Sequence, residues 1–280
     1  MKICFSDFWS PFDPNNNFFI HLLKQSFENV EVVNPEDADI MFFSVFGMEN
    51  TLYKNCKKIF FTGENQRPNF KNCDYSLTFD FNDYEGKNFR LPLWYLYIDW
   101  FNVKTYDNPQ WLIPESYLYG ENEFTKKSKD KFCSTVFSAF YEKRINAINK
   151  LSNYKQVDVY GKYGTQLEYG ERNKLNIVSD YKFSICFENS IYPGYFTEKL
   201  LHAKITGTIP LYYSDLSFDN DFNPKCCINL EEIGFDLLYE KVVEIDNNKK
   251  LYKEILEEPL FLKKIFLDPI IDNIKKTISI

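Results

Sequence analysis

Histidine is nearly absent from this sequence, which holds only His21 and His202 among 280 residues. Both lie in segments with helical periodicity, so a Ser-His-Asp or Cys-His catalytic arrangement has almost nothing to build on. A His-Glu-x-x-His motif, a Cys-x-x-Cys pair and clustered cysteine and histidine at metal-ligand spacing are also missing. The sequence therefore disfavours triad hydrolases, and it predicts no bound metal.

Glycine-rich phosphate loops and long apolar runs are missing as well. The 10 glycines form neither the dinucleotide-binding fingerprint nor the phosphate-binding loop, which weakens dehydrogenase and kinase interpretations. No run of about 18 apolar residues is present, so no transmembrane segment is expected. The opening residues include Asp7 where a signal peptide needs an unbroken apolar stretch. We expect a soluble protein, cytoplasmic in type.

The number and spacing of the cysteines are also typical of a protein from a reducing compartment. The seven cysteines are odd in number and scattered, which does not suit a disulfide framework in a chain of this size. Cys4, Cys133 and Cys186 lie inside apolar runs, where cysteine behaves as a small buried hydrophobe. We expect reduced thiols without a catalytic role.

An excess of positive charge is missing too. The formal net charge is -7, whereas proteins that bind nucleic acid depend on clustered lysine and arginine. Nucleic acid is therefore not an expected partner. The sequence is 44% hydrophobic and 19% aromatic, which is enough apolar material for two domain cores.

Short apolar runs alternate with segments of helical periodicity, which is typical of an α/β fold with parallel sheets. A charged stretch over Thr125–Lys131 has no apolar period, and it predicts a boundary between domains 1–125 and 126–280. The expected strands are Lys2–Phe5, Val30–Val33, Asp39–Val45, Lys58–Thr62, Tyr75–Phe79, Phe132–Ser138, Val157–Tyr160, Phe183–Phe187, Thr208–Tyr212 and Cys226–Leu230. The expected helices are Asn17–Phe27 with Asn16 as cap, Glu142–Ser152, Thr197–Thr206 and a helical C-terminal region.

Polar residues follow the strand expected at Phe183–Phe187. Glu188, Asn189 and Ser190 come at its end, where open α/β sheets bind their ligands. Thr197 is a good N-cap, and Glu198 and Lys199 stand in the first turn of the helix after it. A lysine there opposes the helix dipole unless an anion is near. Either Glu198 or an anionic ligand could be that partner.

At this point the sequence resembles a known family. The segments Cys186-Phe187-Glu188-Asn189, Gly194-Tyr195, Thr197-Glu198-Lys199 and Thr208-Ile209-Pro210 are similar to the signature of the α-1,3/4-fucosyltransferases, glycosyltransferase family 10. Further likeness to this family lies in Phe61-Thr62-Gly63-Glu64-Asn65, Pro68-Asn69-Phe70, Arg90-Leu91-Pro92-Leu93, and in Ser138 with Arg144 and Asn146.

The resemblance implies two Rossmann-like domains facing a cleft, the GT-B arrangement, with the acceptor mostly on the N-terminal domain and GDP-fucose mostly on the C-terminal one. It implies an inverting α-1,3-fucosyltransferase that moves fucose from GDP-fucose to a GlcNAc-containing oligosaccharide. Glu64 is then the general base. The alternative is that Glu64 caps nearby amides in a turn or pairs with Arg67.

The resemblance also implies the donor-binding residues. Arg144 and Lys199 are the expected diphosphate cations, and Glu198 the acceptor of ribose hydroxyl hydrogen bonds. Asn189, Tyr195 and Ser138 complete the expected donor site. Glu188 is expected either to stabilise positive charge on fucose or merely to satisfy backbone amides. No cofactor is required, and a divalent cation would act only as a stimulant.

Several readings stay open on the sequence. One alternative is a GT-B glycosyltransferase that uses another donor, because every physical argument given above, except the family signature, applies to it as well. The other is an inactive carbohydrate-binding homologue, which would keep the same fold. The family pattern is interrupted by Ser190-Ile191-Tyr192-Pro193. The triplet Asp219-Asn220-Asp221 is read as a turn rather than a metal site. Trp94, Tyr95 and Trp100 belong either to the core or to a sugar-binding surface.

Overall fold

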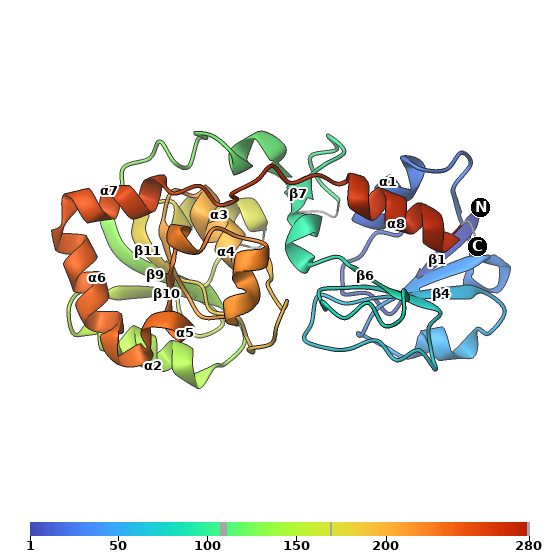
Figure 1. The fold of residues 1–280 in the computed structure, drawn as a ribbon, viewed down its shortest axis with the longest axis horizontal. Helices are drawn as coiled ribbons and strands as arrows, with labels where there is room; N and C mark the ends of the chain where they lie inside the picture. The colour runs from blue at the N-terminus through green and yellow to red at the C-terminus, as the bar shows by residue number, and fades with distance from the viewer. Residues whose placement is uncertain (107–110, 169, 279–280) are drawn as a thin grey trace. The chain divides into compact units, whose positions relative to one another are not determined.

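The computed structural model describes residues 1–106, 111–168 and 170–278 and divides the chain into two compact units (Figure 1). Unit 1 comprises Met1–Ile113 and Ile265–Ile280, and unit 2 comprises Pro114–Lys264. Each unit has a parallel sheet and an apolar core of its own. The predicted α/β class with parallel sheets is confirmed.

Unit 1 is built on a six-stranded sheet in the order β2-β1-β3-β4-β5-β6, with every neighbouring pair parallel. All four residues of β3 are buried, as expected for a parallel strand covered on both faces. The strands are β1 (Lys2–Ser6), β2 (Glu31–Val32), β3 (Ile40–Phe43), β4 (Lys57–Phe61), β5 (Tyr75–Thr78) and β6 (Asn88–Arg90). A separate ribbon pairs β7 (Ile98–Asp99) with β8 (Ile113–Pro114).

Two helices from opposite ends of the chain share the main core of unit 1. Helix α1 (Phe18–Lys24) contacts α8 (Asp268–Ile278), and Figure 1 shows the two side by side. Ile270 and Ile274 of α8 are buried in this core. The cap of α1 is Asn17 rather than the expected Asn16, because the side chain of Asn17 accepts the amide of Ile20 at 3.0 Å.

The opposite face of this sheet carries a smaller apolar cluster that includes Cys4, Met41, Phe60 and Cys73. Cys4 is buried there, as its apolar run predicts, and so is Cys73. Burial raises the pKa of each of these two thiols to about 12. All seven cysteines, each within the described ranges, are free thiols.

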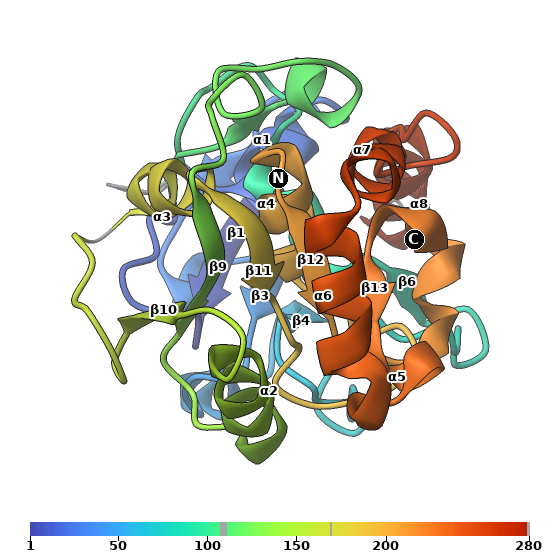
Figure 2. The same cartoon turned by 90° about the vertical axis from the view of Figure 1, so that its left-hand side faces the viewer.

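Unit 2 contains a five-stranded parallel sheet in the order β10-β9-β11-β12-β13, and Figure 2 shows its strands side by side. The strands are β9 (Lys131–Phe137), β10 (Val157–Gly161), β11 (Tyr181–Ile185), β12 (Ile209–Tyr212) and β13 (Ile228–Asn229). The helices are α2 (Glu142–Ser152), α3 (Glu171–Val178), α4 (Glu198–Ile205), α5 (Leu230–Ile233), α6 (Leu238–Asn247) and α7 (Lys249–Glu257).

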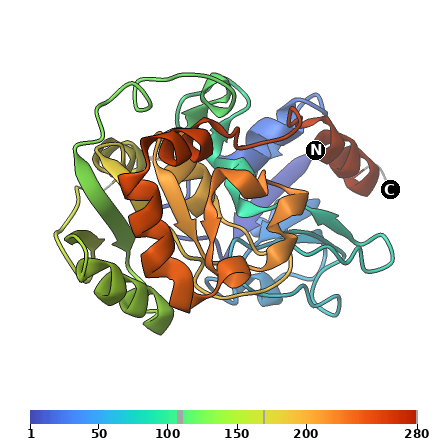
Figure 3. The same ribbon diagram turned by 60° about the vertical axis from the view of Figure 1, so that its left-hand side comes forward.

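Helices cover both faces of the second sheet. Phe183 and Ile185 of β11 share a core with residues of α2 and α6, and the orange-red α6 lies across the sheet in Figure 3. Ser184 and Cys186 have the opposite parity along the strand and face residues of α3 and α4. Helices α3 and α4 therefore cover this second face of the sheet.

None of the described helices is long and apolar enough to span a bilayer. Short 3₁₀ turns connect many of the helices and strands. The turns are Pro35–Asp37, Glu49–Leu52, Leu93–Tyr97, Glu115–Leu118, Leu216–Asn220, Pro224–Cys226 and Phe235–Leu237.

The division into units differs from the predicted boundary at residue 125 in two places. Residues 114–125 belong to unit 2, where the side-chain amide of Asn122 donates to the carbonyl of Ile205. The last helix, predicted to belong to the C-terminal domain, packs instead on the core of unit 1. The charged stretch is therefore part of unit 2 and not a linker.

Lys129 connects this charged stretch to the rest of unit 2. Its partly buried ammonium donates to the carbonyls of Phe124 at 3.0 Å, Ser179 at 2.5 Å and Thr206 at 2.7 Å. Burial lowers its pKa to about 8, so the group remains mainly protonated at neutral pH. One cation therefore joins the segment before β9 to the ends of α3 and α4.

Replacing Lys129 should test this role. Lys129→Met leaves three buried carbonyls without their shared donor, and we expect it to lower the free energy of unfolding by about 3 kcal/mol at pH 7. Urea denaturation followed by circular dichroism would measure the loss. Lys126→Met is the matched control, because Lys126 is 67% exposed and its Glu121 contact is 4.0 Å long. Equal stability of the two variants would contradict this role.

Candidate active site

The carboxyl ends of β9, β10 and β11 and the first turns of α3 and α4 surround a cavity of about 580 Å³ in unit 2. Gly161 ends β10 with a φ of +95°, and a Cβ there would collide with the carbonyl of Phe137. Glycine is therefore required where these strands end close together. The residues that line the cavity include Ser138, Ala139, Lys162, Glu171, Lys174, Asn189, Glu198 and Lys199.

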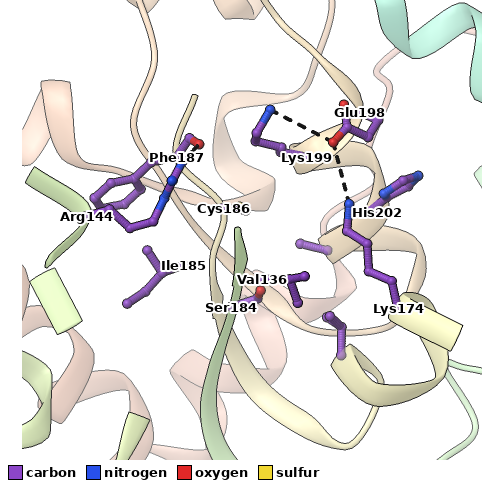
Figure 4. A pocket seen from close by; sticks show the side chains of 12 residues that line it. Val136, Arg144, Lys174, Ser184, Ile185, Cys186, Phe187, Glu198, Lys199 and His202 are labelled. Carbon is purple, nitrogen blue, oxygen red and sulfur yellow. Dashed lines mark hydrogen bonds and ion pairs between the residues drawn. The ribbon is translucent and has the colours of Figure 1, made fainter. Parts of the chain in front are cut away.

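A second, much smaller cavity of about 40 Å³ shares Lys174, Glu198 and Lys199 with the first and is also lined by Arg144 and His202. Figure 4 shows the carboxylate of Glu198 between the ammonium groups of Lys174 and Lys199. The larger cavity, the small one and the charged groups therefore form a single site.

The chain after β11 brings Glu188 to the start of α4. Extended backbone continues past Ile185, since the amide of Cys186 donates to Leu211 and the amide of Glu188 to Tyr213, at 3.0 and 3.1 Å. Thr197 is the N-cap of α4 as predicted, but its hydroxyl donates to Glu188 and does not accept an amide of the helix. The first amides of α4 are thus left without the usual side-chain cap.

Glu188 is fully buried and both of its carboxylate oxygens are occupied. Oε1 accepts hydrogen bonds from the amide of Thr197 and the hydroxyl of Tyr212, each at 2.8 Å. Oε2 accepts from the hydroxyl of Thr197 at 2.8 Å and from Nζ of Lys199 at 3.2 Å. Through these bonds, one from a backbone amide and three from side chains, Glu188 anchors the start of α4.

Lys199 is the cation that this anchor positions. Its side chain is 20% exposed, and its Nζ also donates to the hydroxyl of Thr197 at 2.7 Å. Burial alone would lower its pKa, but the nearby carboxylates of Glu188 and Glu198 outweigh burial and raise it. Lys199 is therefore a fixed positive charge on the cavity surface.

Glu198 is held between two cations. Its Oε1 lies 3.5 Å from Nζ of Lys174 and 3.9 Å from Nζ of Lys199. Burial would raise the pKa of Glu198, yet Lys199 and Lys174 lower it far below its usual range. The carboxylate is thus ionised and oriented at the edge of the cavity, where it can accept hydrogen bonds from hydroxyl groups.

Arg144 lies beneath this surface, with 2% of its area exposed. Its guanidinium donates to the carbonyls of Ala139 and Phe187 at 3.0 and 2.7 Å and to Oδ1 of Asn189 at 3.2 Å. Burial lowers its pKa although the charge of Glu188 opposes the shift. Arg144 therefore fixes Asn189 and adds positive potential from below the cavity.

The remaining predicted donor residues separate into two groups. Ser138 and Asn189 are exposed side chains that line the large cavity at the ends of β9 and β11. Tyr195 is buried, and it is not part of the lining of either cavity. The structure thus brings Ser138, Arg144, Asn189, Glu198 and Lys199 together, with Glu188 behind them.

Sequence reasoning missed the contribution of α3. Its first turn carries Glu171 and Lys174, and Nδ1 of His202 lies 3.4 Å from Oε2 of Glu171. Burial raises the pKa of Glu171, whereas burial and the charge of Lys174 lower the pKa of His202 well below its usual value. His202 is therefore a neutral imidazole within this cluster of charges.

Glu64 lies in unit 1, at the turn that follows β4. It lines a separate cavity of about 200 Å³ together with Trp9, Phe46, Gly63, Leu93, Leu96 and Tyr97. The hydroxyl of Thr62 accepts the amide of Glu64 at 2.9 Å and fixes the turn. Among the described residues, no side chain or amide is bonded to the exposed Glu64 carboxylate.

Arg67, the alternative partner for Glu64, contacts other groups. Its Nε lies 3.3 Å from Oδ2 of Asp80, and Nη2 donates to Oδ1 of Asn65 at 2.9 Å. Trp94 is buried, and Tyr95 and Trp100 are half-buried and pack against the main core of unit 1. None of the three lines the cavity that contains Glu64.

The described residues contain no group of three or more His, Cys, Asp or Glu side chains arranged to hold a metal ion. Asp219 and Asn220 end a 3₁₀ turn, and the side chain of Asn220 donates to the carbonyl of Ser217 at 2.8 Å. This local bonding agrees with the turn expected for the acidic triplet.

Two family models match the sequence, one in each unit. The model of the α-(1,3)-fucosyltransferase FucT N-terminal domain matches residues 3–97, and the C-terminal model of glycosyltransferase family 10, the fucosyltransferases, matches residues 126–257. The chain belongs to glycosyltransferase family 10. The first match includes Glu64, and the second includes every residue of the charged cavity described above.

Relatives within family 10 are similar over different parts of the chain. The α-(1,3)-fucosyltransferase FucT of Helicobacter pylori is 29% identical over 93% of this chain and 60% of its own length. The human 4-galactosyl-N-acetylglucosaminide 3-α-L-fucosyltransferase 9 is 30% identical over 46% of this chain and 37% of its own length. This chain therefore spans less than two thirds of either relative.

Solved structures of family members share the fold. An α1,3-fucosyltransferase crystal structure superimposes with a TM-score of 0.80 at 26% identity, covering 100% of this chain and 90% of the other. The crystal structure of an α1,3-fucosyltransferase with GDP-fucose superimposes with a TM-score of 0.75, also at 26% identity, and covers 99% of this chain and 89% of the other.

The anchoring role of Glu188 generates a stability prediction. Glu188→Gln replaces one acceptor oxygen by an amide donor and leaves the Lys199 charge without its buried partner, so we expect a loss of about 3 kcal/mol in unfolding free energy. Glu171→Gln is the matched comparison. Because the pKa of Glu171 is raised, its ionised form is disfavoured in the folded state, and its neutral replacement should cost less than about 1 kcal/mol at pH 7. Urea denaturation at pH 7 measures both, and equal losses would contradict the anchor.

Proposed function

We propose that this chain is an inverting α-1,3-fucosyltransferase that transfers fucose from GDP-fucose to a GlcNAc-containing glycan of the N-acetyllactosamine type. One observation carries the proposal. In a unit that matches family 10, Lys199 and Arg144 supply positive charge to a cavity whose edge carries the ionised carboxylate of Glu198. A nucleoside diphosphate offers the complementary chemistry, with an anionic diphosphate beside a ribose that bears hydroxyl groups.

Lys199 would contact the diphosphate directly, because its ammonium is partly exposed at the uncapped start of α4. Arg144 would act from below by its field and by orienting the side-chain amide of Asn189. As the bond to the fucose carbon breaks, both charges stabilise the negative charge that collects on GDP. Glu198 would accept hydrogen bonds from the ribose hydroxyls, and Lys174 would keep it ionised.

Glu64 would be the general base. It removes the proton from the accepting hydroxyl while that oxygen forms its bond to the anomeric carbon and the bond from this carbon to the phosphate oxygen breaks. A single displacement of this kind inverts the anomeric centre. It requires the two units to present Glu64 and Lys199 to opposite sides of the same fucose, in the arrangement expected for a GT-B enzyme.

The donor and the acceptor are supported by different relatives. A related α1,3-fucosyltransferase has been solved with GDP-fucose, which supports the donor. The name of the human relative specifies a 4-galactosyl-N-acetylglucosaminide, which supports an N-acetyllactosamine acceptor. The proposed mechanism has no step that needs a cofactor, and a divalent cation would act only as a stimulant.

Glu64→Gln should test both the reaction and the base. The amide keeps the shape of the carboxylate but cannot take a proton, so we expect transfer from GDP-fucose to N-acetyllactosamine to fall about 10²- to 10⁴-fold. Glu85→Gln, an exposed carboxylate in another turn of unit 1, should be unaffected. The measurement is fucosylated product by mass spectrometry. Undiminished turnover by Glu64→Gln would remove Glu64 as the base, and no product from the unmodified protein would reject the proposed function.

The donor site can be tested without turnover. Lys199→Gln removes a charge-assisted contact of about 1.5 to 3 kcal/mol, so GDP should bind about 10- to 150-fold more weakly by calorimetry. Lys199→Arg keeps the charge and should recover part of this loss. Lys225→Gln, an exposed lysine of the same unit, is the control for net charge. If Lys199→Gln bound GDP as tightly as the unmodified protein does, the diphosphate would not contact Lys199.

A further inference from the structure

We propose that Phe46 and Trp9 form an aromatic platform that binds the apolar face of the acceptor sugar and presents its hydroxyl to Glu64. This inference rests on the proposed function and adds the residues that recognise the acceptor. The platform and Glu64 line the same cavity of unit 1.

Phe46 is unusual among the aromatic side chains of unit 1 because 53% of its surface is exposed although it lines a cavity. Its ring lies edge-on to Trp9, with centroids 6.5 Å apart. Trp9 in turn contacts Phe61 of β4, with centroids 6.3 Å apart, so the platform is supported by the sheet that carries Glu64. The exposed ring is therefore mounted on the core.

Asp7 holds the loop that carries Phe46. Its carbonyl accepts the amide of Phe46 at 2.9 Å, and its carboxylate accepts the amides of Glu49 and Asn50, also at 2.9 Å. Asp7 itself has a φ of +58°, an unfavourable conformation that the surrounding bonds maintain. The side-chain amide of Asn50 also donates to the Asp7 carboxylate, at 2.6 Å. Four hydrogen bonds to one residue thus fix the loop Phe46–Asn50 at the end of β3.

Glycine completes this loop. A Cβ on Gly47 would collide with the carboxylate of Asp7, so a larger residue would push the loop away from its anchor. The fixed position matters because an aromatic ring that is already ordered loses little entropy when a ligand covers it. The loop therefore holds the ring of Phe46 in an ordered position beside the cavity, although about half of that side chain stays exposed to water.

The chemistry of the cavity selects a sugar ring. Aromatic and aliphatic side chains form most of the lining, and Glu64 supplies the carboxylate. The C–H groups on one face of a pyranose carry slight positive charge and pack against the negative face of an aromatic ring. The hydroxyls at its edge then reach a carboxylate. Pockets that combine many apolar contacts with few polar ones orient ligands in this way.

Phe46→Ala tests the platform by enzyme kinetics. Covering about half of a phenylalanine side chain is worth about 1 kcal/mol, so the KM for N-acetyllactosamine should rise about fivefold to tenfold. The Kd for GDP, measured by calorimetry, should stay within about twofold, since diphosphate binding belongs to unit 2. Phe46→Tyr keeps the aromatic face and should restore the KM. Leu52→Ala, which removes an apolar side chain 73% exposed and outside the cavity, is the matched control.

An unchanged KM in Phe46→Ala would overturn the platform, and so would a parallel rise in the Kd for GDP, which would indicate a folding defect. Equal KM values for Phe46→Ala and Leu52→Ala would overturn it as well. Melting temperatures of all variants verify that each one folds.

Tryptophan fluorescence tests the platform without turnover. Addition of N-acetyllactosamine alone should change the emission of the unmodified protein, because the sugar covers the partly exposed Trp9. The change should disappear in Trp9→Phe and remain in Trp100→Phe. A protein that gives this response but no product would keep the sugar site and reject the proposed reaction. No response in the unmodified protein, or a response that survives in Trp9→Phe, would reject the platform.

Discussion

The bonds between Glu188, Thr197 and Lys199 determine where the charges of the candidate site stand. Taking a carboxylate and an ammonium out of water costs several kcal/mol per ion, and good geometry with full hydrogen bonding must offset that cost. Glu188 meets this requirement with four donors, and its own amide is bonded to the chain beyond β12. Because Glu188 is fixed by the sheet, Lys199 is fixed as well, and the start of α4 cannot shift without breaking several bonds together.

Charges of alternating sign extend from this anchor into the cavity. Lys199 is followed by Glu198, Lys174 and Glu171, each within 4.0 Å of the next. The neutral His202 lies behind them and adds no further charge. In this way a chain of net charge -7 holds local cations, since Lys199 and Lys174 are each paired with carboxylates. The diphosphate proposed as ligand would then meet donors that are already oriented and need little reorganisation.

The sequence predicted the strands well because each is a short apolar run bounded by turn residues. It missed α3, where Glu171-Arg172-Asn173-Lys174 gives no apolar period and Gly170 gives no capping signal. It also missed β6, β7 and β8, which have only two or three residues each. Periodicity predicted a helical C-terminal region but could not decide which core α8 joins. Likewise, positions after strand ends indicated Glu188 and Asn189, whereas the role of Glu188 depends on Tyr212, 24 residues away.

The roles proposed for the two units place opposite demands on the burial of their charged side chains. Cations that stabilise a leaving diphosphate work best when they are ordered beforehand, and for the proposed donor this order would come from the ion pair of Lys199 and the hydrogen bonds of Arg144. A general base must exchange its proton with water after each turnover, so burial in a saturated network like that of Glu188 would prevent its function. Glu64 is exposed at a turn that only backbone and Thr62 bonds define. In the proposed reaction this exposed carboxylate takes the place that histidine, present only twice in the chain, holds as general base in many other enzymes.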